Sequence, residues 1–316
     1  MLLPGTGLPR GRILTVLPLP VAAVLAIAGC GSADPAGTQE ADAGAAGTHV
    51  VEHARGEAEV PEDPQRVVVL EPVQLDTSVA LGAVPVGAAV FDEAAGAPAY
   101  LGEEASGIES VGTVPEPNLE KIAALEPDLI LGTESRHSAL FDQLDSIAPT
   151  VFMASQADPW TENVELVARA LGDEEGAAEL LADYEERCTE VADAHGTEGM
   201  TAQLIRPRDE VLTLYGPTSF AGSTLECAGF TTPEHEWEDI SLDISPERVL
   251  DARADHVFVT AADVDAPDAV PDAITSNEDS FPELHTVDQA FWIAGVGPLG
   301  GMTVLDDLDR ILSASE

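Results

Sequence analysis

The chain has 316 residues, and its 58 aspartates and glutamates outnumber its 13 lysines and arginines, which gives a formal net charge of −45. A surface this acidic repels phosphate groups, so it excludes nucleic acid and anionic membrane surfaces as binding partners. The length allows one large domain or two lobes that each have a core.

The first 29 residues have the pattern of an export signal. Arg10 and Arg12 precede an apolar run that is too short for a confident membrane span, and the small residues of "IAGC" lead to Cys30. These residues resemble a bacterial lipobox, in which the cysteine is lipidated and becomes the new N-terminus. An ordinary signal peptide with an incidental cysteine is the alternative. We expect a signal peptide over residues 1–29 and a protein held by a lipid on Cys30 at the outer face of the cell membrane.

A segment rich in glycine, alanine and polar residues follows over residues 30–58, and this composition is typical of a flexible tether. Beyond it, over residues 59–158, short β-branched runs alternate with helical patterns. We expect strands at 66–72, 85–90, 128–132 and 150–154, and helices at 73–82, 118–127 and 138–149. This alternation predicts an N-terminal α/β lobe with a largely parallel sheet.

Residues 159–198 read as a helical segment between two lobes. Gly172 and Gly196 are stop signals, so one helix should end near Leu171 and a longer one should span residues 173–195. A second α/β block then occupies residues 199–316. Its strands are expected at 202–206, 210–216 and 255–261, and its helices at 223–230, 245–254 and 299–314.

The two blocks contain a faint repeat. Residues 118–131 align without a gap with residues 245–258, and each copy is a short helix that leads into a strand. Asn118 and Ser245, both good helix caps, occupy the same position in the two copies. The repeat predicts two α/β lobes of similar build, joined by one long helix. Ligands of such proteins bind in the cleft between the lobes, at the carboxyl ends of the strands.

Several segments resemble the iron-siderophore substrate-binding lipoproteins of ABC importers, the type with a rigid helix between the lobes. They occur in family order over most of residues 60–313: "DPQRVVVLEPVQLDTSVALGAVPVG", "VGTVPEPNLEKIAALEPDLILG", "SRHSALFDQLDSIAPTVF", "WTENVELVARALG", "LYGPTSFAGSTLECAGF", "DISPERVLDARADHVFV" and "GVGPLGGMTVLDDLDRIL". The resemblance implies a monomeric binding protein rather than an enzyme. It would capture ferric siderophore and deliver it to the permease subunits, holding iron only through the siderophore and needing no cofactor.

The few cations of this chain are the first candidates for ligand contacts. A ferric siderophore presents oxygen ligands and often negative charge, which an arginine fork binds well. Arg136 follows the strand expected at 128–132, so it should lie on the cleft rim; a surface ion pair is the alternative. His137 either lines the pocket or is an ordinary loop histidine. The resemblance places further ligand-contacting arginines near Arg206 and Arg208, whose alternative role is a turn paired with acids.

Aromatic side chains are the second group of ligand-binding candidates. Tyr215 ends a predicted strand, and Trp237 and Trp292 lie in loop-like sequence, so all three are positioned to line a cleft. Buried packing is the alternative for each. Tris-catecholate binders of this family tend to have an arginine in the turn that here contains Phe220. The resemblance therefore favours a siderophore of the hydroxamate or citrate/carboxylate type.

Glu120 and Glu247 occupy matched positions in the repeat. In the family that the chain resembles, one glutamate per lobe docks onto arginine pockets of the permease. The alternative is a purely local role, because an acidic residue in the first turn favours the helix dipole.

Other functions remain open at this point. Haem or cobalamin would suit the same fold, with His137 or His285 as a metal ligand. A secreted hydrolase or an adhesin is a further alternative, although the chain contains neither GxxxxGK[ST] nor GxSxG. Cys188 and Cys227 either pair in an oxidising compartment or remain as buried thiols, and no cysteine and histidine cluster has metal-binding spacing.

Overall fold

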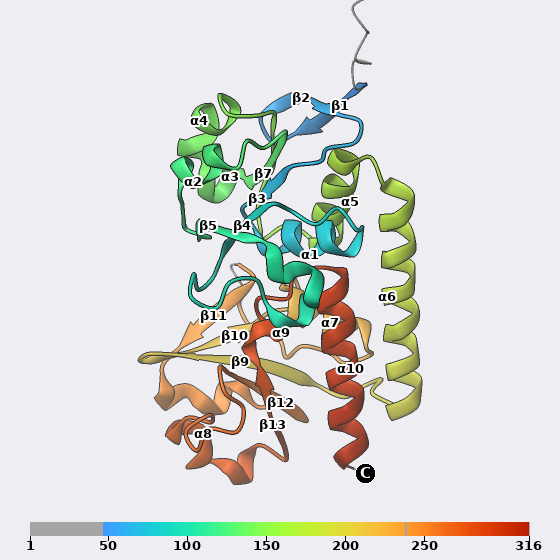
Figure 1. The fold of residues 1–316 in the computed structure, drawn as a ribbon. Helices are drawn as coiled ribbons and strands as arrows, with labels where there is room; N and C mark the ends of the chain where they lie inside the picture. The colour runs from blue at the N-terminus through green and yellow to red at the C-terminus, as the bar shows by residue number, and fades with distance from the viewer. Residues whose placement is uncertain (1–46, 238, 316) are drawn as a thin grey trace, which may run out of the picture. The chain divides into compact units, whose positions relative to one another are not determined.

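The computed structural model describes residues 47–237 and 239–315. The predicted signal peptide, Cys30 and the first part of the predicted tether lie outside these residues. A six-stranded sheet occupies the N-terminal half of the described chain and a five-stranded sheet the C-terminal half (Figure 1). None of the helices in the described ranges combines the length and apolar character that a membrane span requires.

The six-stranded sheet has its most apolar strands at the centre. Its strands, from edge to edge, are β6 (Glu116–Pro117), β5 (Glu109–Thr113), β4 (Gly87–Val90), β3 (Val67–Val69), β7 (Leu129–Thr133) and β8 (Thr150–Met153). All pairings are parallel except β5 with β6. Every residue of β3, β4, β7 and β8 is buried, as expected when helices cover both faces of a parallel sheet.

Helices pack on both faces of this sheet. They are α1 (Pro72–Ala80), α2 (Leu119–Ala124), α3 (Glu134–His137), α4 (Phe141–Asp145) and α5 (Trp160–Leu171), with 3₁₀ turns η1 (Ala99–Leu101), η2 (Glu103–Gly107) and η3 (Ser138–Leu140). Residues of α1 and α5 share one apolar cluster with the odd-numbered valines of β3. Residues of α2 and α4 share another with Val68 on the opposite face.

The five-stranded sheet is mixed. Its strands, from edge to edge, are β11 (Ser241–Ile244), β10 (Val211–Tyr215), β9 (Ala202–Arg208), β12 (His256–Ala261) and β13 (Glu283–Asp288). Strands β9, β12 and β13 pair in parallel, whereas β9, β10 and β11 form an antiparallel meander. The surrounding helices are α7 (Phe220–Cys227), α8 (Asp272–Thr275), α9 (Gln289–Trp292), η4 (Pro246–Ala252) and η5 (Glu278–Ser280). The two sheets confirm the predicted α/β fold with mainly parallel strands.

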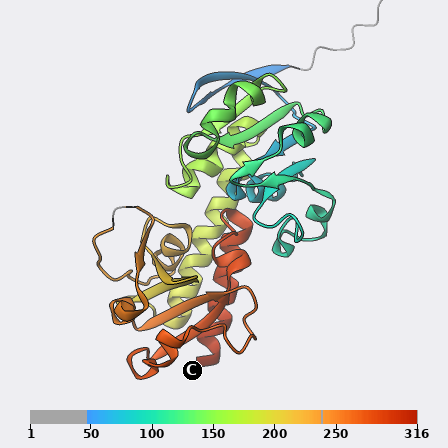
Figure 2. The ribbon, with the colours of Figure 1, turned by 90° about the vertical axis from the view of Figure 1, so that its left-hand side faces the viewer.

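Two long helices accompany both sheets. Helix α6 (Glu174–His195) begins after the left-handed Gly172 and ends at the left-handed Gly196, as the sequence predicts. Helix α10 (Pro298–Ser315) packs along α6 and reaches α1, and both views show the two helices side by side (Figures 1 and 2). One apolar cluster includes Val73 of α1, Leu204 of β9 and residues of both long helices. The connection between the sheets is therefore a packed core.

Asp76 strengthens this connection. Its side chain is fully buried and accepts hydrogen bonds from the backbone N–H groups of Leu299 and Gly300, at 2.9 and 2.8 Å. The hydroxyl of Tyr100 donates a third bond at 2.9 Å. A carboxylate at a helix N-terminus compensates the orphan N–H groups and the helix dipole. Asp76 therefore ties α1 to the first turn of α10.

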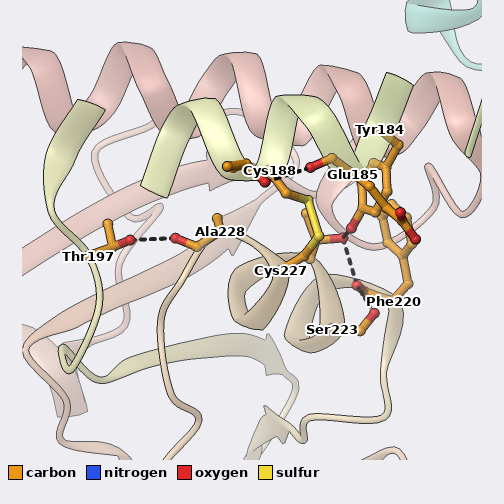
Figure 3. The surroundings of a disulfide bond; sticks show 10 residues. Tyr184, Glu185, Cys188, Thr197, Phe220, Ser223, Cys227 and Ala228 are labelled. Atoms are coloured by element: carbon orange, nitrogen blue, oxygen red, sulfur yellow. Dashed lines mark hydrogen bonds between the residues drawn. A yellow bond between two sulfur atoms is a disulfide. The ribbon is translucent and has the colours of Figure 1, made fainter. Parts of the chain in front are cut away.

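A second tie joins α6 to α7, where Cys188 and Cys227 form a disulfide with a Cα–Cα distance of 5.4 Å. Figure 3 shows this bond between α6 and the end of α7. Nearby, the hydroxyl of Tyr184 donates to Thr224. The structure thus resolves the choice left open by the sequence in favour of the disulfide.

Two local predictions are wrong. Residues in the last part of the predicted tether form the antiparallel hairpin β1 (Thr48–His53) and β2 (Gly56–Pro61). Polar residues dominate this hairpin, but Val51 and Val60 are buried against the six-stranded sheet, which holds it in place. The segment expected as a helix over 245–254 is the 3₁₀ helix η4.

Candidate functional site

Two adjoining cavities lie between the six-stranded and five-stranded sheets. One has a volume of about 610 Å³ and is called the large compartment; the other, of about 170 Å³, is called the small compartment. Both are lined by Pro72, Phe91, Arg206 and Ile293, so together they form one cleft. Residues that follow β3, β4 and β7 contribute to it, as the rule for carboxyl ends of parallel strands predicts.

The small compartment contains an ion pair. Arg136 lies on α3, directly after β7, and its Nε is 3.2 Å from Oε1 of Glu71. The two side chains differ in burial, since Arg136 is 35% exposed and Glu71 only 2%. Burial raises the pKa of Glu71 to about 7, although the positive charge of Arg136 acts in the opposite direction.

Local sequence fixes the position of Glu71. It follows the buried strand β3 and is the N-cap of α1, with Pro72 in the first turn. Oε1 of Gln74 accepts from the backbone N–H groups of Leu70 and Glu71, and its Nε2 donates to the carbonyl of Gly132 in β7. These bonds hold the strand end and the helix start together, so the glutamate side chain is held at the cleft.

The large compartment is mostly apolar. Phe91 follows β4 directly, is 53% exposed and lines both compartments. Three alanines and Pro98 of the segment after β4 provide much of the wall, together with Tyr100 and Ile293. Arg206, on β9, is the only lysine or arginine among the residues that line this compartment. The cleft therefore offers apolar surface beside one arginine from each sheet.

The structure brings four of the candidate residues to the cleft. Arg136, Arg206 and Tyr215 line the small compartment. Trp292 lies behind its wall with no exposed surface, stacked on Phe258 at 5.0 Å and donating from Nε1 to Asp307. Trp292 is thus positioned to report on the cleft without touching solvent.

Three other candidates lie elsewhere. The ring of His137 is buried: Nδ1 accepts from the backbone N–H of Thr133, and Nε2 is 2.8 Å from the carbonyl of Val114. Its pKa is lowered chiefly by burial. His137 is therefore a packed residue behind the cleft rather than a residue of its lining.

The side chains of Arg208 and Trp237 contact residues of the C-terminal half. Arg208 binds both oxygens of Asp243 at 2.8 and 2.9 Å and donates to the hydroxyl of Thr213. Trp237 is half-buried and packs edge to face on His235 at 5.1 Å. Neither residue is among those lining the two compartments, so neither shares the cleft with Arg136.

Glu71 and Phe91 are the cleft residues that our sequence reasoning missed. The signal was present, since each directly follows a buried apolar run that forms a central parallel strand. The rule that selected Arg136 after β7 applies equally to Glu71 after β3 and Phe91 after β4.

Glu120 and Glu247 are both exposed and lie in the first turns of α2 and η4. The Asn118 side chain caps α2 by accepting from the N–H groups of Glu120 and Lys121. The pKa of Glu247 is lowered mainly by its own backbone N–H and by Ser245. Neither glutamate forms an ion pair with another residue in the described ranges, so both carboxylates are accessible.

Known proteins share this architecture. The sequence model of the family described as "Periplasmic binding protein" matches residues 67–280. The "Probable siderophore-binding lipoprotein YfiY" of Bacillus subtilis is 30% identical over 310 residues, which cover 91% of this chain and 94% of that protein. The "Fe(3+)-citrate-binding protein YfmC" of the same species is 28% identical over 260 residues, covering 79% of this chain and 80% of YfmC.

A solved structure of a siderophore complex also has a fold similar to that of this chain. Staphylococcus aureus SirA, complexed with staphyloferrin B, matches with a TM-score of 0.69 and 27% identity. The match covers 84% of this chain and 99% of SirA.

Proposed function

We propose that this chain, which belongs to the family of periplasmic binding proteins, captures a ferric siderophore outside the cytoplasmic membrane and delivers it to an ABC importer. The observation that carries the proposal is the position of two arginines in the cleft. Arg136 comes from the N-terminal half and Arg206 from the C-terminal half, and both line the small compartment. In a chain with 13 lysines and arginines, this placement favours an anionic ligand.

The chemistry of a ferric complex suits such a site. Its oxygen ligands and negative charge match the guanidinium fork, which makes bidentate, charge-assisted hydrogen bonds. A chain with a formal charge of −45 repels anions at long range, so cations inside the cleft are needed to hold one. Iron is cargo in this proposal, bound only through the siderophore.

The relatives narrow the class of siderophore. YfmC is named for ferric citrate, and YfiY is named as a probable siderophore-binding protein. The name of YfmC supports the citrate/carboxylate type for this chain, and we propose a siderophore of the hydroxamate or citrate/carboxylate type. The apolar large compartment supports a ligand that also has apolar arms, which Phe91 and Ile293 would contact.

Delivery requires a membrane location and a docking surface. A lipid on Cys30 would hold the protein, as a monomer, at the extracytoplasmic face of the cell membrane. Glu120 and Glu247 would dock onto the permease subunits, and their exposed, unpaired carboxylates support this role. Reversal of both charges to lysine should abolish iron uptake while leaving siderophore affinity intact; unchanged uptake would contradict the docking role.

Haem and cobalamin are the alternative ligands. His137 and His285, the two histidines considered as metal ligands, are not among the residues that line the cleft. His285 instead packs against the rings of His256 and Phe258, at 5.6 and 5.2 Å. This arrangement gives histidine-ligated haem no support.

A titration of tryptophan fluorescence tests the proposal. The probes are ferric citrate, ferrioxamine B as a hydroxamate, ferric enterobactin as a tris-catecholate, haemin and cobalamin. We expect saturable quenching at sub-micromolar concentration by ferric citrate or ferrioxamine B, because Trp160 and Trp292 lie at the small compartment. Saturation by haemin or cobalamin alone would replace the function, and saturation by ferric enterobactin alone would replace the siderophore class.

A further inference from the structure

Glu71 is an unusual residue for the cleft of an anion-binding protein. Its carboxyl group lines the small compartment, carries a negative charge when ionised and is almost completely buried. Its Oε1 atom accepts no hydrogen bond from the described residues, and the charge that compensates it is Arg136, with Nε at 3.2 Å. Burying a carboxylate costs several kcal/mol unless it is paired, so this single cation matters.

The contact leaves part of Arg136 available. Glu71 approaches Nε, at the side of the guanidinium group, and the two terminal nitrogens have no hydrogen-bond partner in the described ranges. Arg136 lines the small compartment and is 35% exposed there. The pair is therefore arranged so that Glu71 orients the arginine while the end of the fork can bind a ligand.

An anionic ligand on that fork changes the surroundings of Glu71. The ligand shares the charge of Arg136 and adds a second negative charge beside a buried carboxylate. Both effects favour the neutral carboxylic acid over the carboxylate. The groups of the protein that oppose both effects are Arg136, the side chain of Thr133 and the backbone N–H of Gln74 in the first turn of α1.

The other titratable and charged groups of the small compartment do not replace Glu71 as the group that becomes neutral when an anion binds. Arg206 faces it from β9, Tyr215 from β10 and Asp158 from the segment before α5. Asp158 accepts from the backbone N–H of Ser155. His137, behind Arg136, uses both ring nitrogens within the protein, and burial lowers its pKa.

We propose that Glu71 is a proton-linked specificity residue: it positions Arg136 in the empty cleft and takes up one proton from solvent when an anionic ferric complex occupies the small compartment. The carboxylate becomes a carboxylic acid, whose O–H can donate a hydrogen bond. The inference rests on the proposed function and adds to it a preference for ligands with anionic oxygens, together with a pH dependence.

The sign of the pH dependence follows from linkage. Burial raises the pKa of Glu71 to about 7 in the empty protein, and the bound anion raises it further. Below pH 7 the proton is already present, whereas above pH 7 binding must bring it in. Affinity should therefore fall as pH rises from 7 to 8.5, by up to about tenfold per pH unit for one proton.

Calorimetric titration with ferric citrate, in excess citrate, tests the inference between pH 6.0 and 8.5. Buffers of different ionisation enthalpy give the number of protons taken up on binding. We expect close to one proton at pH 8 for the wild-type chain. In Glu71→Gln we expect no uptake and an affinity independent of pH, because the amide has the same shape and cannot titrate.

Glu134→Gln is the matched control. Glu134 lies on the same helix as Arg136 but pairs with Arg55, at 2.6 Å, and does not line the cleft. This variant should follow the wild-type profile. If Glu71 were only a packing residue, Gln would shift the affinity by the same factor at every pH.

The outcomes distinguish the proposed role of Glu71 from the proposed siderophore function. Tight binding of ferric citrate with no proton uptake, or with the same uptake in Glu71→Gln, would overturn the role of Glu71 and leave the siderophore function intact. Absence of binding by every siderophore at every pH would overturn the proposed function, and the inference with it. The melting temperature of Glu71→Gln, measured alongside, should stay close to that of the wild type.

Discussion

Glu71 and Asp76 are two buried carboxyl groups at one helix, α1, and burial raises the pKa of each to about 7. Their partners differ. Asp76 accepts from two backbone N–H groups of α10 and from Tyr100, whereas Glu71 faces a cavity and its charge is compensated by Arg136. Burial alone therefore does not identify a functional acid. Donors fixed by the backbone indicate a structural tie, and an exchangeable side-chain cation beside a cavity indicates a binding site.

The same contrast separates two regions of the molecule. The joint, formed by α1, α6, α10, Asp76 and the disulfide, is held together by a shared apolar cluster, by the backbone donors of Asp76 and by the covalent bond. The cleft retains groups whose partners are incomplete: the terminal nitrogens of Arg136, Oε1 of Glu71 and the exposed ring of Phe91. Substitutions in the joint should lower stability, and substitutions in the cleft should lower affinity.

The largest effect is expected from removal of the disulfide. Cys188 and Cys227 are 39 residues apart, and closing a loop of this length stabilises the fold by about 4 kcal/mol. The double Cys→Ser variant should lose roughly that free energy of unfolding, measured with urea. Ligand affinity of the folded variant should stay within twofold of wild type. A large loss of affinity with little loss of stability would show that the disulfide supports ligand binding, and would contradict the separation between joint and cleft.

Asp76→Ala comes next. It leaves two N–H groups of α10 and the hydroxyl of Tyr100 without a partner, so we expect a loss of about 3 kcal/mol in the free energy of unfolding. Glu71→Gln, on the same helix, is the matched comparison and should change stability by less than about 1 kcal/mol. Equal losses from the two variants would show that the two acids play the same role.

Arg136→Ala should act on binding. Loss of a charge-assisted contact typically costs about 2 kcal/mol, which corresponds to roughly 30-fold weaker affinity for ferric citrate. Arg208→Ala removes an arginine that is paired with Asp243 outside the cleft, so its affinity should match the wild type. If Arg208→Ala weakened binding more than Arg136→Ala, the anion would be bound by Arg208 on the hairpin of β9 and β10 rather than by Arg136.

Phe91→Ala is expected to have the smallest effect. Loss of apolar contact in the large compartment should weaken binding by about 1 kcal/mol, or roughly fivefold, for a ferric complex with apolar arms such as ferrioxamine B. Ferric citrate, which lacks such arms, should be less affected. Val264→Ala, at an exposed apolar residue outside the cleft, should change neither affinity. Equal effects on the two ligands would argue against separate compartments.

The sequence predicted the fold well because its strongest signals are local and periodic. The buried runs at β3, β4, β7 and β8, and the glycines that end α5 and α6, identify the elements directly. The hairpin of β1 and β2 was missed because only Val51 and Val60 are buried, and its polar residues resemble those of a tether.

The site was predicted in part for a related reason. Arg136 was found because its position after a strand is a property of sequence order. The placement of His137 in the core, and of Arg208 beside Asp243, depends on long-range contacts that a single sequence does not reveal. Glu71 was overlooked because an acid is inconspicuous in so acidic a chain.

Locating the iron tests directly whether this cleft binds the ferric complex. Crystals of the protein grown with ferric citrate or ferrioxamine B would give an anomalous-scattering peak wherever the ferric complex is held. We expect one peak in the cleft, next to Arg136 and Arg206, with Glu71 beside the bound complex. A peak at another surface, with the cleft unoccupied at saturating ligand, would contradict the assignment of this cleft as the siderophore site.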